Sequence, residues 1–313
     1  MVALFVGGGQ IHALVITAGS AVHRVLAERN GMERQRHRLQ SDLDLLAEER
    51  VPDAVRAVAA RSLASSLQQF SDVFTPVLDV VGAGPVLIAA VGQMATVPWL
   101  LLPGLAGRPV TVSSSVTRAL AGLTTPQTRP ADHGVLVAAG PGLSNGEKEA
   151  CAVAALHPGS RLLVGADATG RAVLDAIPQA GLVHIAAHGH HEAENPLFSG
   201  VQFADGLLFG YDLAPNPTLP GQVVLSSCDV GQTDDRPGGE PLGLVAALVR
   251  SGVPTVISGT SKISDTVAEA TMVGYHERLI DGASPATALA EAVAAAGADS
   301  GLPAPFSCFG AGL

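Results

Sequence analysis

Residues 181–189, GLVHIAAHG, and residues 221–228, GQVVLSSC, decide the fold class of this sequence. Each stretch is a short, nearly continuous apolar run that ends in a residue able to do chemistry. A strand with one face in water alternates apolar and polar residues, whereas a strand that is buried on both faces does not need to. Both stretches are therefore predicted to be central strands of a parallel sheet.

The surrounding sequence repeats this strand pattern and separates the strands by helical patterns, in which apolar residues recur every three or four positions. Further strands are predicted at 134–142, 160–169 and 253–260, and helices at 144–157, 169–180, 239–252, 265–282 and 284–297. Alternating strands and helices indicate an α/β fold, with helices covering both faces of a mostly parallel sheet.

The N-terminal part has a different pattern. A β-hairpin is predicted around the three glycines at 7–9, followed by helix from about His23 to Val81 with a new helix start at Pro52. Short buried strands are predicted at 85–91 and 108–115. The polar connection TTPQTRPADHG then divides the chain near residue 130 into an N-terminal half, 1–130, and a C-terminal half, 131–313.

Composition excludes several classes of function. With 18 basic and 28 acidic residues, the net charge of −10 argues against a nucleic-acid surface, which needs clustered cations. The locally basic segment 23–39 also carries acidic residues and is interpreted as a solvated helix face. Prolines and glycines interrupt the charge-free stretch 80–107, so no membrane span is expected. Three scattered cysteines and no signal peptide indicate a cytoplasmic protein.

The residues that could be catalytic lie at the ends of these two strands. His188 follows one strand and Cys228 follows the other. Because the carboxyl ends of parallel strands meet at one edge of a sheet, we expect imidazole and thiol to lie close together there. An imidazole can take the thiol proton, and the thiolate can then attack a carbonyl. The N–H groups of Gly189 and Cys228 are expected to form the oxyanion hole.

The sequence resembles the CHAT domains, caspase- and separase-like cysteine peptidases. The resemblance is carried by LVHIAAHGHHEAENPLFSGVQFADG, YDL, VVLSSCDVGQ, GGEPLGLVAALVRSGVPTVISGT and LIDGASPATALAEA, in this order. It covers nearly the whole chain and implies a caspase-like α/β/α sandwich, with His188 as the general base and Cys228 as the nucleophile. It also implies that residues 1–130 form a degenerate pseudo-peptidase or regulatory half. Many relatives carry a Leu-Trp pair where this chain reads GTSKISD at 259–265, which puts the shape of the substrate pocket in question.

Other histidines and cysteines have simpler interpretations. His184 shares a strand face with His188 and is expected to be buried and structural. His190 and His191 are expected to be exposed in the following loop, and Cys151 and Cys308 to be inert. The spacing HIAAH occurs in zinc peptidases, but the glutamate of their motif is missing and the context is a strand. No metal and no organic cofactor is therefore expected.

Acidic residues near the nucleophile are candidates for a substrate pocket. Asp265 follows the strand after the cysteine, where separase-like relatives hold an acidic residue that faces a basic side chain. The alternative is that Asp265 only caps the helix that it precedes. Asp229 and Glu240, together with Asp234 and Asp235 between them, are the other candidates.

The resemblance implies a regulated cysteine endopeptidase that cleaves specific protein partners. Bacterial relatives act in regulated proteolysis or antiviral defence, for example by cleaving a gasdermin or another effector, and relatives commonly accompany a sensor or activator protein. A sensor is not expected within these 313 residues, so the chain is either a stand-alone protease or a piece of a longer one. Two alternatives stay open: a catalytically silent interaction scaffold, and an esterase or transpeptidase with the same dyad.

Overall fold

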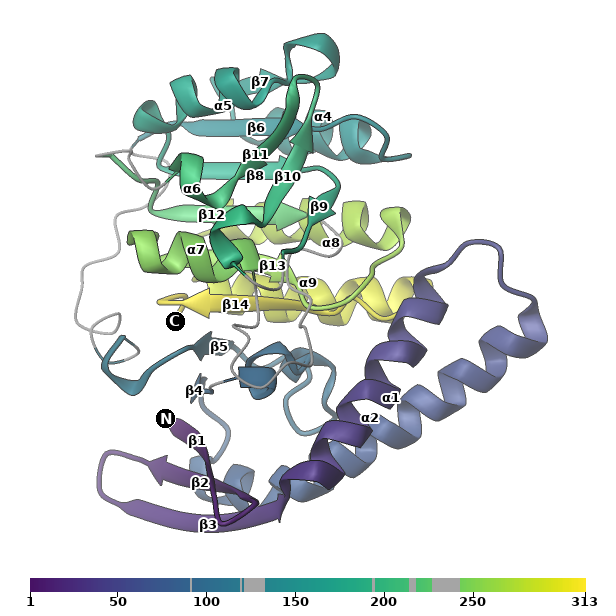
Figure 1. Cartoon of the computed structure of the whole chain (residues 1–313), viewed down its shortest axis with the longest axis vertical. Helices are drawn as coiled ribbons and strands as arrows, with labels where there is room; N and C mark the ends of the chain where they lie inside the picture. Colours follow the sequence, from purple (N-terminus) through teal and green to yellow (C-terminus); the bar gives the residue numbers. More distant parts are fainter. Residues whose placement is uncertain (91, 119, 121–132, 193–194, 214–217, 227–242) are drawn as a thin grey trace.

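The computed structural model describes residues 1–313 except 91, 119, 121–132, 193–194, 214–217 and 227–242 (Figure 1). Its main sheet has the strand order β3-β2-β1-β4-β5-β14-β13-β12-β8-β6-β7, and a smaller sheet has the order β11-β10-β9. The strands are β1 (Val2–Gly7), β2 (Gln10–Ile16), β3 (Ala21–Glu28), β4 (Val86–Ala89), β5 (Val110–Ser113), β6 (Val135–Ala139), β7 (Arg161–Leu163), β8 (Leu182–Ala186), β9 (Gly189–His190), β10 (Gly200–Phe203), β11 (Gly206–Phe209), β12 (Gln222–Ser226), β13 (Thr255–Gly259) and β14 (Phe306–Gly310). The helices are α1 (Arg29–Ala47), α2 (Asp53–Val81), α4 (Gly146–Leu156), α5 (Gly170–Ala176), α6 (Gly210–Leu213), α7 (Gly243–Ser251), α8 (Asp265–Ile280) and α9 (Pro285–Ser300).

The predicted parallel sheet is confirmed in the C-terminal half. Strands β7, β6, β8, β12 and β13 run parallel, and every residue of β8, β12 and β13 is buried. The register between β8 and β12 pairs His184 with Val224 and Ala186 with Ser226. Burial on both faces explains why these strands lack an alternating pattern. We call the two ends of this parallel set the amino edge and the carboxyl edge.

Helices cover both faces, as expected for an α/β/α sandwich. Helices α4, α8 and α9 pack against one another on one face, and α5, α6 and α7 lie on the other (Figure 1). The largest fully buried side chains include Trp99, Phe70 and Phe203. The interior therefore extends through both halves of the chain.

Strand β14 joins the two halves and was not predicted. It runs antiparallel to β13 and parallel to β5, so β4 and β5 run opposite to β12 and β13. The expected boundary near residue 130 lies outside the described residues, and one continuous sheet extends to either side of it. The division into two halves stays a prediction.

The N-terminal hairpin of β1 and β2 is confirmed, but the helix predicted from His23 is wrong. Residues Ala21–Glu28 form a third strand, β3, whose residues from Ala21 to Leu26 alternate between exposed and half-buried. Period-two exposure is typical of a strand on the edge of a sheet. Only from Arg29 is the basic segment helical.

Helices α1 and α2 form a long antiparallel hairpin that projects from the sandwich (Figure 1). The second helix begins at Asp53 directly after Pro52, as predicted. Arg56 closes the turn between the helices, because its guanidinium donates to the carbonyl oxygens of Leu46 and Glu48 at 3.0 and 2.9 Å. We call this hairpin the helical arm.

Candidate active site

His188 lies at the carboxyl edge, two residues after the last residue of β8, and is exposed. Its carbonyl oxygen accepts a hydrogen bond from the Gln202 N–H at 2.8 Å, which fixes the backbone between β8 and the small sheet. The imidazole lies over Gly142, where a Cβ atom would be 3.3 Å from Nε2 and the backbone has a φ of +86°. A glycine at this turn lets the ring lie against the backbone.

Gly189 is placed so that its N–H points away from the small sheet. In the β9–β10 ladder, His188 and Gln202 form a hydrogen-bonded pair, so the adjacent pair, Gly189 and Val201, is a non-hydrogen-bonded one. The N–H of a residue in such a pair points outward from the ladder. This direction is compatible with the expected role in an oxyanion hole.

Other predicted site residues lie outside the described residues. These are Cys228, Asp229, Asp234, Asp235 and Glu240. In the sequence, Cys228 comes two residues after Ser226, the last residue of β12.

A small pocket opens beside Ser226 at the carboxyl edge. It is lined by Leu143, Asn145, Gly146, Glu149, Ser226, Ile263, Asp265, Ala268 and Phe306, and we call it the edge pocket. Ser226 is 5% exposed, and its hydroxyl finds no hydrogen-bond partner among the described residues. Glu149 and Asp265 add two carboxyl groups, so the pocket offers oxygen acceptors to a ligand that brings hydrogen-bond donors.

Asp265 is in this pocket but does not have the alternative role of N-cap. The N-cap residue of α8 is Ser264, and Asp265 is the first residue of the helix. Its Oδ2 accepts a hydrogen bond of 2.9 Å from the Ser144 N–H, in the loop between β6 and α4. The carboxylate therefore ties the beginning of α8 to that loop.

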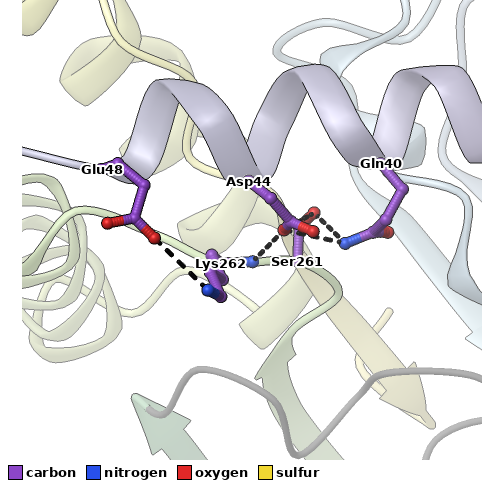
Figure 2. Close-up of polar contacts among 5 residues, drawn as sticks. All are labelled: Gln40, Asp44, Glu48, Ser261 and Lys262. Atoms are coloured by element: carbon purple, nitrogen blue, oxygen red, sulfur yellow. Dashed lines mark hydrogen bonds and ion pairs between the residues drawn. The ribbon is translucent and has the colours of Figure 1, made fainter. Parts of the chain in front are cut away.

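The segment before Asp265 is held by the helical arm (Figure 2). The Asp44 carboxylate accepts a hydrogen bond of 3.2 Å from the Lys262 N–H and one of 3.5 Å from the Ser261 hydroxyl. Gln40 donates to the Ser261 hydroxyl at 2.5 Å, and Glu48 pairs with the Lys262 ammonium at 3.3 Å. The arm thus reaches the wall of the edge pocket through two neighbouring residues.

We expect Asp44→Ala to loosen this segment and to lower the free energy of unfolding by about 1–2 kcal/mol, because it removes acceptors from a backbone N–H and a buried hydroxyl. Urea denaturation measures the loss, and amide hydrogen exchange at Lys262 should become faster. Glu48→Ala is the matched control. Its ion pair is exposed, so stability should change by less than about 0.5 kcal/mol. Equal effects of both variants would contradict the assignment.

The other histidines near His188 differ in their exposure to solvent. His184 is fully buried, as predicted, and His190 is exposed, as predicted. The expected exposure of His191 is wrong: it is half-buried, and its ring packs against Gly243 at the beginning of α7. Within the described residues, no group of three or more His, Cys, Asp or Glu side chains is arranged to hold a metal ion.

Cys308 lies in the middle of the sheet on β14 and is buried, whereas Cys151 is exposed on α4. Burial raises the pKa of the Cys308 thiol to about 12, against a weaker opposing effect of the Thr111 hydroxyl. A thiol with such a pKa is almost entirely protonated at neutral pH, and the thiol form is not the nucleophile. The prediction that Cys308 is inert therefore has a physical basis.

Alkylation should separate these two thiols. In a Cys228→Ala background at about pH 8, iodoacetamide should label Cys151 in the native protein and Cys308 only after unfolding. Peptide mapping by mass spectrometry measures both sites. Labelling of native Cys308 at the rate of Cys151 would show that β14 opens readily.

The CHAT domain family matches residues 60–304. The chain belongs to this family. No curated protein matches the sequence significantly. Among solved structures, the CHAT-domain chain is similar to two crystal structures of the Saccharomyces cerevisiae separase–securin complex. The TM-scores are 0.72 and 0.55, with sequence identities of 9% and 13%.

The matches cover 99% and 72% of this CHAT-domain chain, but only 29% and 16% of the chains that they match. At such low identity the comparison shows a common fold, which is the caspase-like α/β/α sandwich that the resemblance implied. Among the described residues, no helix has the length and apolar character needed to cross a membrane.

Sequence reasoning did not find Glu149 or Ser226 as parts of the site. Glu149 belongs to a helix pattern that looks like an ordinary solvated face, yet it is 3% exposed. Its hydrogen-bond partner is His184, 35 residues later, and no local pattern connects the two. The sequence pattern places Ser226 only in the strand that precedes Cys228.

Proposed function

We propose that this chain is a cysteine endopeptidase with His188 as the general base and Cys228 as the nucleophile. One observation carries the proposal: β8 and β12 are adjacent and parallel, and the last residues of both, Ala186 and Ser226, are paired in register. His188 and Cys228 each follow this pair by two residues. Membership of the CHAT family supports the same assignment.

The reaction follows from these two groups. The His188 imidazole takes the proton of the Cys228 thiol, and the thiolate attacks the carbonyl carbon of the scissile peptide bond. The oxyanion that forms is stabilised by the N–H groups of Gly189 and Cys228. The C–N bond then breaks, and the imidazolium gives its proton to the leaving amine. Water, deprotonated by His188, hydrolyses the acyl-enzyme and regenerates the thiol.

We propose that the edge pocket, with a volume of about 20 Å³, receives the terminal charged group of a basic side chain that precedes the scissile bond. Asp265 lines it, as does Ser226, whose hydroxyl has no hydrogen-bond partner among the described residues and which comes two residues before the proposed nucleophile. A Lys or Arg side chain would bring donors to these acceptors and a positive charge to a carboxylate. Asp229 and Glu240, which lie outside the described residues, stay candidates for the same pocket.

The proposed substrates are specific proteins, with a sensor or activator protein controlling the enzyme. The separase in the similar crystal structures is in complex with securin. For this chain we propose regulated bacterial proteolysis or antiviral defence as the setting, with an effector such as a gasdermin as substrate. A nucleophilic thiol suits a reducing compartment, so we place the activity in the cytoplasm.

Cleavage of a diverse peptide library, analysed by mass spectrometry, tests the proposal. The wild type should cut after Lys or Arg, Cys228→Ala should not cut, and Cys151→Ala should behave as the wild type. Cuts after small or aliphatic residues would contradict the basic pocket. If no peptide is cut and a peptide acyloxymethyl ketone fails to label Cys228, the scaffold alternative is favoured.

A further inference from the structure

A line of four hydrogen-bonded side chains crosses the interior beneath α4. Glu149 Oε1 is 3.0 Å from His184 Nε2, His184 Nδ1 is 3.1 Å from His276 Nε2, and His276 Nδ1 is 2.9 Å from His157 Nε2. Glu149, His184 and His276 are buried, and His157 is half-buried. We call these four residues the imidazole relay. The proposed peptidase mechanism uses none of them.

The two ends of the relay open at opposite edges of the sheet. Glu149 lies near the beginning of α4 and lines the edge pocket at the carboxyl edge. His157 directly follows α4 and lines a cavity of about 570 Å³ at the amino edge, between the beginnings of β6, β8 and β12 and the α8–α9 connection. His184 and His276 bridge the distance from β8 and α8.

The hydrogen bonds constrain where the protons are. A neutral imidazole has one donor and one acceptor nitrogen, and an ionised carboxylate only accepts. If Glu149 is ionised and accepts from His184 Nε2–H, then His184 Nδ1 must accept from His276 Nε2–H. His276 Nδ1 must in turn accept from His157 Nε2–H. The geometry therefore fits three neutral Nε2–H tautomers and one negative charge at Glu149.

We propose that Glu149 is a second specificity-determining carboxylate of the edge pocket, and that proton uptake at His157 on the opposite edge controls its charge through His276 and His184. This inference rests on the proposed function and names a further residue of its substrate pocket. It also assigns the amino-edge cavity as the entrance for the controlling proton.

One proton enters the imidazole relay and moves along its hydrogen bonds. A proton from solvent binds His157 Nδ1, and the Nε2 proton of His157 passes to His276 Nδ1. The Nε2 proton of His276 passes to His184 Nδ1, and the Nε2 proton of His184 remains shared with Glu149. The three histidines then all carry a proton on Nδ1, and the pair formed by Glu149 and His184 has changed from a charge of −1 to a charge of zero. A neutral pair attracts a cationic side chain less.

Several charged and titratable groups surround the relay. Asp265 lines the edge pocket together with Glu149, and Lys148 of α4 pairs with Glu269 of α8 at 2.8 Å. Tyr275 lies beside His276, and burial raises the pKa of its phenol well above the ordinary value, so it stays neutral. None of these groups lines the amino-edge cavity, whereas His157 does.

Burial, with the neighbouring His184 and His157, lowers the pKa of His276 well below the ordinary value for histidine. Burial, with His184, also lowers the pKa of His157. His157 and His276 are therefore neutral near pH 7, and His157 takes up a proton below the usual histidine pKa of about 6.5. The preference of the edge pocket for a basic side chain should be strongest above this pH and should weaken as the pH falls.

Nuclear magnetic resonance of the full chain with ¹⁵N-labelled histidine tests the relay without any need for catalysis. At about pH 7.5, His157, His184 and His276 should all be Nε2–H tautomers, and acidification should convert them together to protonated Nδ1. An Nδ1–H tautomer at His184 or His276 at that pH, or three independent titrations, would overturn the relay.

Binding of agmatine, a guanidinium probe, tests the pocket without catalysis as well. The His184 resonances report agmatine binding during a titration. The wild type should bind agmatine, and Glu149→Gln should bind it more weakly, by about tenfold or more. The variant keeps the acceptor that His184 needs, and thermal unfolding reports whether it folds. Undiminished agmatine binding by folded Glu149→Gln would exclude Glu149 from the pocket.

Enzyme kinetics test whether the imidazole relay controls the preference for a basic side chain. The ratio of kcat/KM for an arginine substrate to that for its norleucine analogue should fall by about tenfold in Glu149→Gln. His157→Gln should flatten the dependence of this ratio on pH between about pH 5.5 and 7.5, whereas exposed His133→Gln, also at the amino edge, should not. An unchanged pH dependence in His157→Gln would overturn the control by His157. If no peptide is cut by any form, the proposed function fails, and the two resonance experiments still decide the relay.

Discussion

Replacement of His188 by alanine is expected to lower kcat/KM for the best peptide substrate by about a thousandfold or more. In the proposed mechanism, loss of the imidazole leaves the thiol of Cys228 without its base and the leaving amine without an acid. Cys228→Ala should be at least as damaging. Because the two residues act as one unit, the double variant should be little worse than Cys228→Ala alone.

The chain offers a matched control two residues away. His190 is exposed at the end of β9, so His190→Ala should change kcat/KM by less than about threefold. The rate at which a peptide acyloxymethyl ketone labels Cys228 gives a second measurement, since it depends on the thiolate. Near-normal turnover by His188→Ala, with the same cleavage sites, would show that another group acts as the base.

Gly140→Ala is expected to have the largest effect on stability near the site, with a loss of about 2–3 kcal/mol in the free energy of unfolding. Gly140 follows β6, and its N–H donates to the Ala186 carbonyl oxygen at 2.8 Å. An added Cβ would collide with the carbonyl oxygen of Gln202 and would lie 2.7 Å from the Cβ of Ala187. These atoms belong to backbone and to a rigid side chain, so they cannot move aside cheaply.

This substitution should also lower activity, because Ala187 precedes His188 and Gln202 holds the His188 carbonyl. Gly31→Ala is the control. It lies in α1, nothing is within 4 Å of its added Cβ, and alanine is a better helix former, so stability should rise by about 0.5–1 kcal/mol. Chemical denaturation and kcat/KM measure both effects. Wild-type stability of Gly140→Ala would mean that the loop after β6 is more adaptable than its contacts indicate.

The C-terminal half of the fold was predictable because its signals are local. Strands β8, β12 and β13 are continuous apolar runs, and each is followed by turn residues or by a helical pattern. Strand β14 has no such context, since it is a short run of five residues after the last helix. Strand β3 was missed because, on a sheet edge, half of its residues face water and several are charged or polar.

The candidate site also has a part that the sequence predicts and a part that it does not. His188 was predictable from a single strand end, whereas the imidazole relay depends on contacts between residues 35, 92 and 119 positions apart. No periodicity reports such distances in sequence. Only the fold brings α4, β8 and α8 together.

The segment GTSKISD, which departs from the Leu-Trp pair of many relatives, also has a structural explanation. Its Ser261 and Lys262 are the residues that Gln40, Asp44 and Glu48 of the helical arm hold (Figure 2). An apolar pair would keep the backbone N–H that donates to Asp44, but it would lack the Ser261 hydroxyl and the Lys262 ammonium. The polar residues therefore suit a chain in which the arm supports the pocket wall.

The place of β14 in the sheet has a consequence for biosynthesis. This strand follows every other described element in the sequence, yet it lies between β5 and β13 and is the connection through which the described sheet becomes continuous. Its first residue, Phe306, also lines the edge pocket. A ribosome that has not yet released residues 306–310 therefore carries two unjoined half-sheets and an unfinished pocket. Nascent protein of this kind is expected to be unable to cut a neighbouring chain before its own synthesis has passed β14.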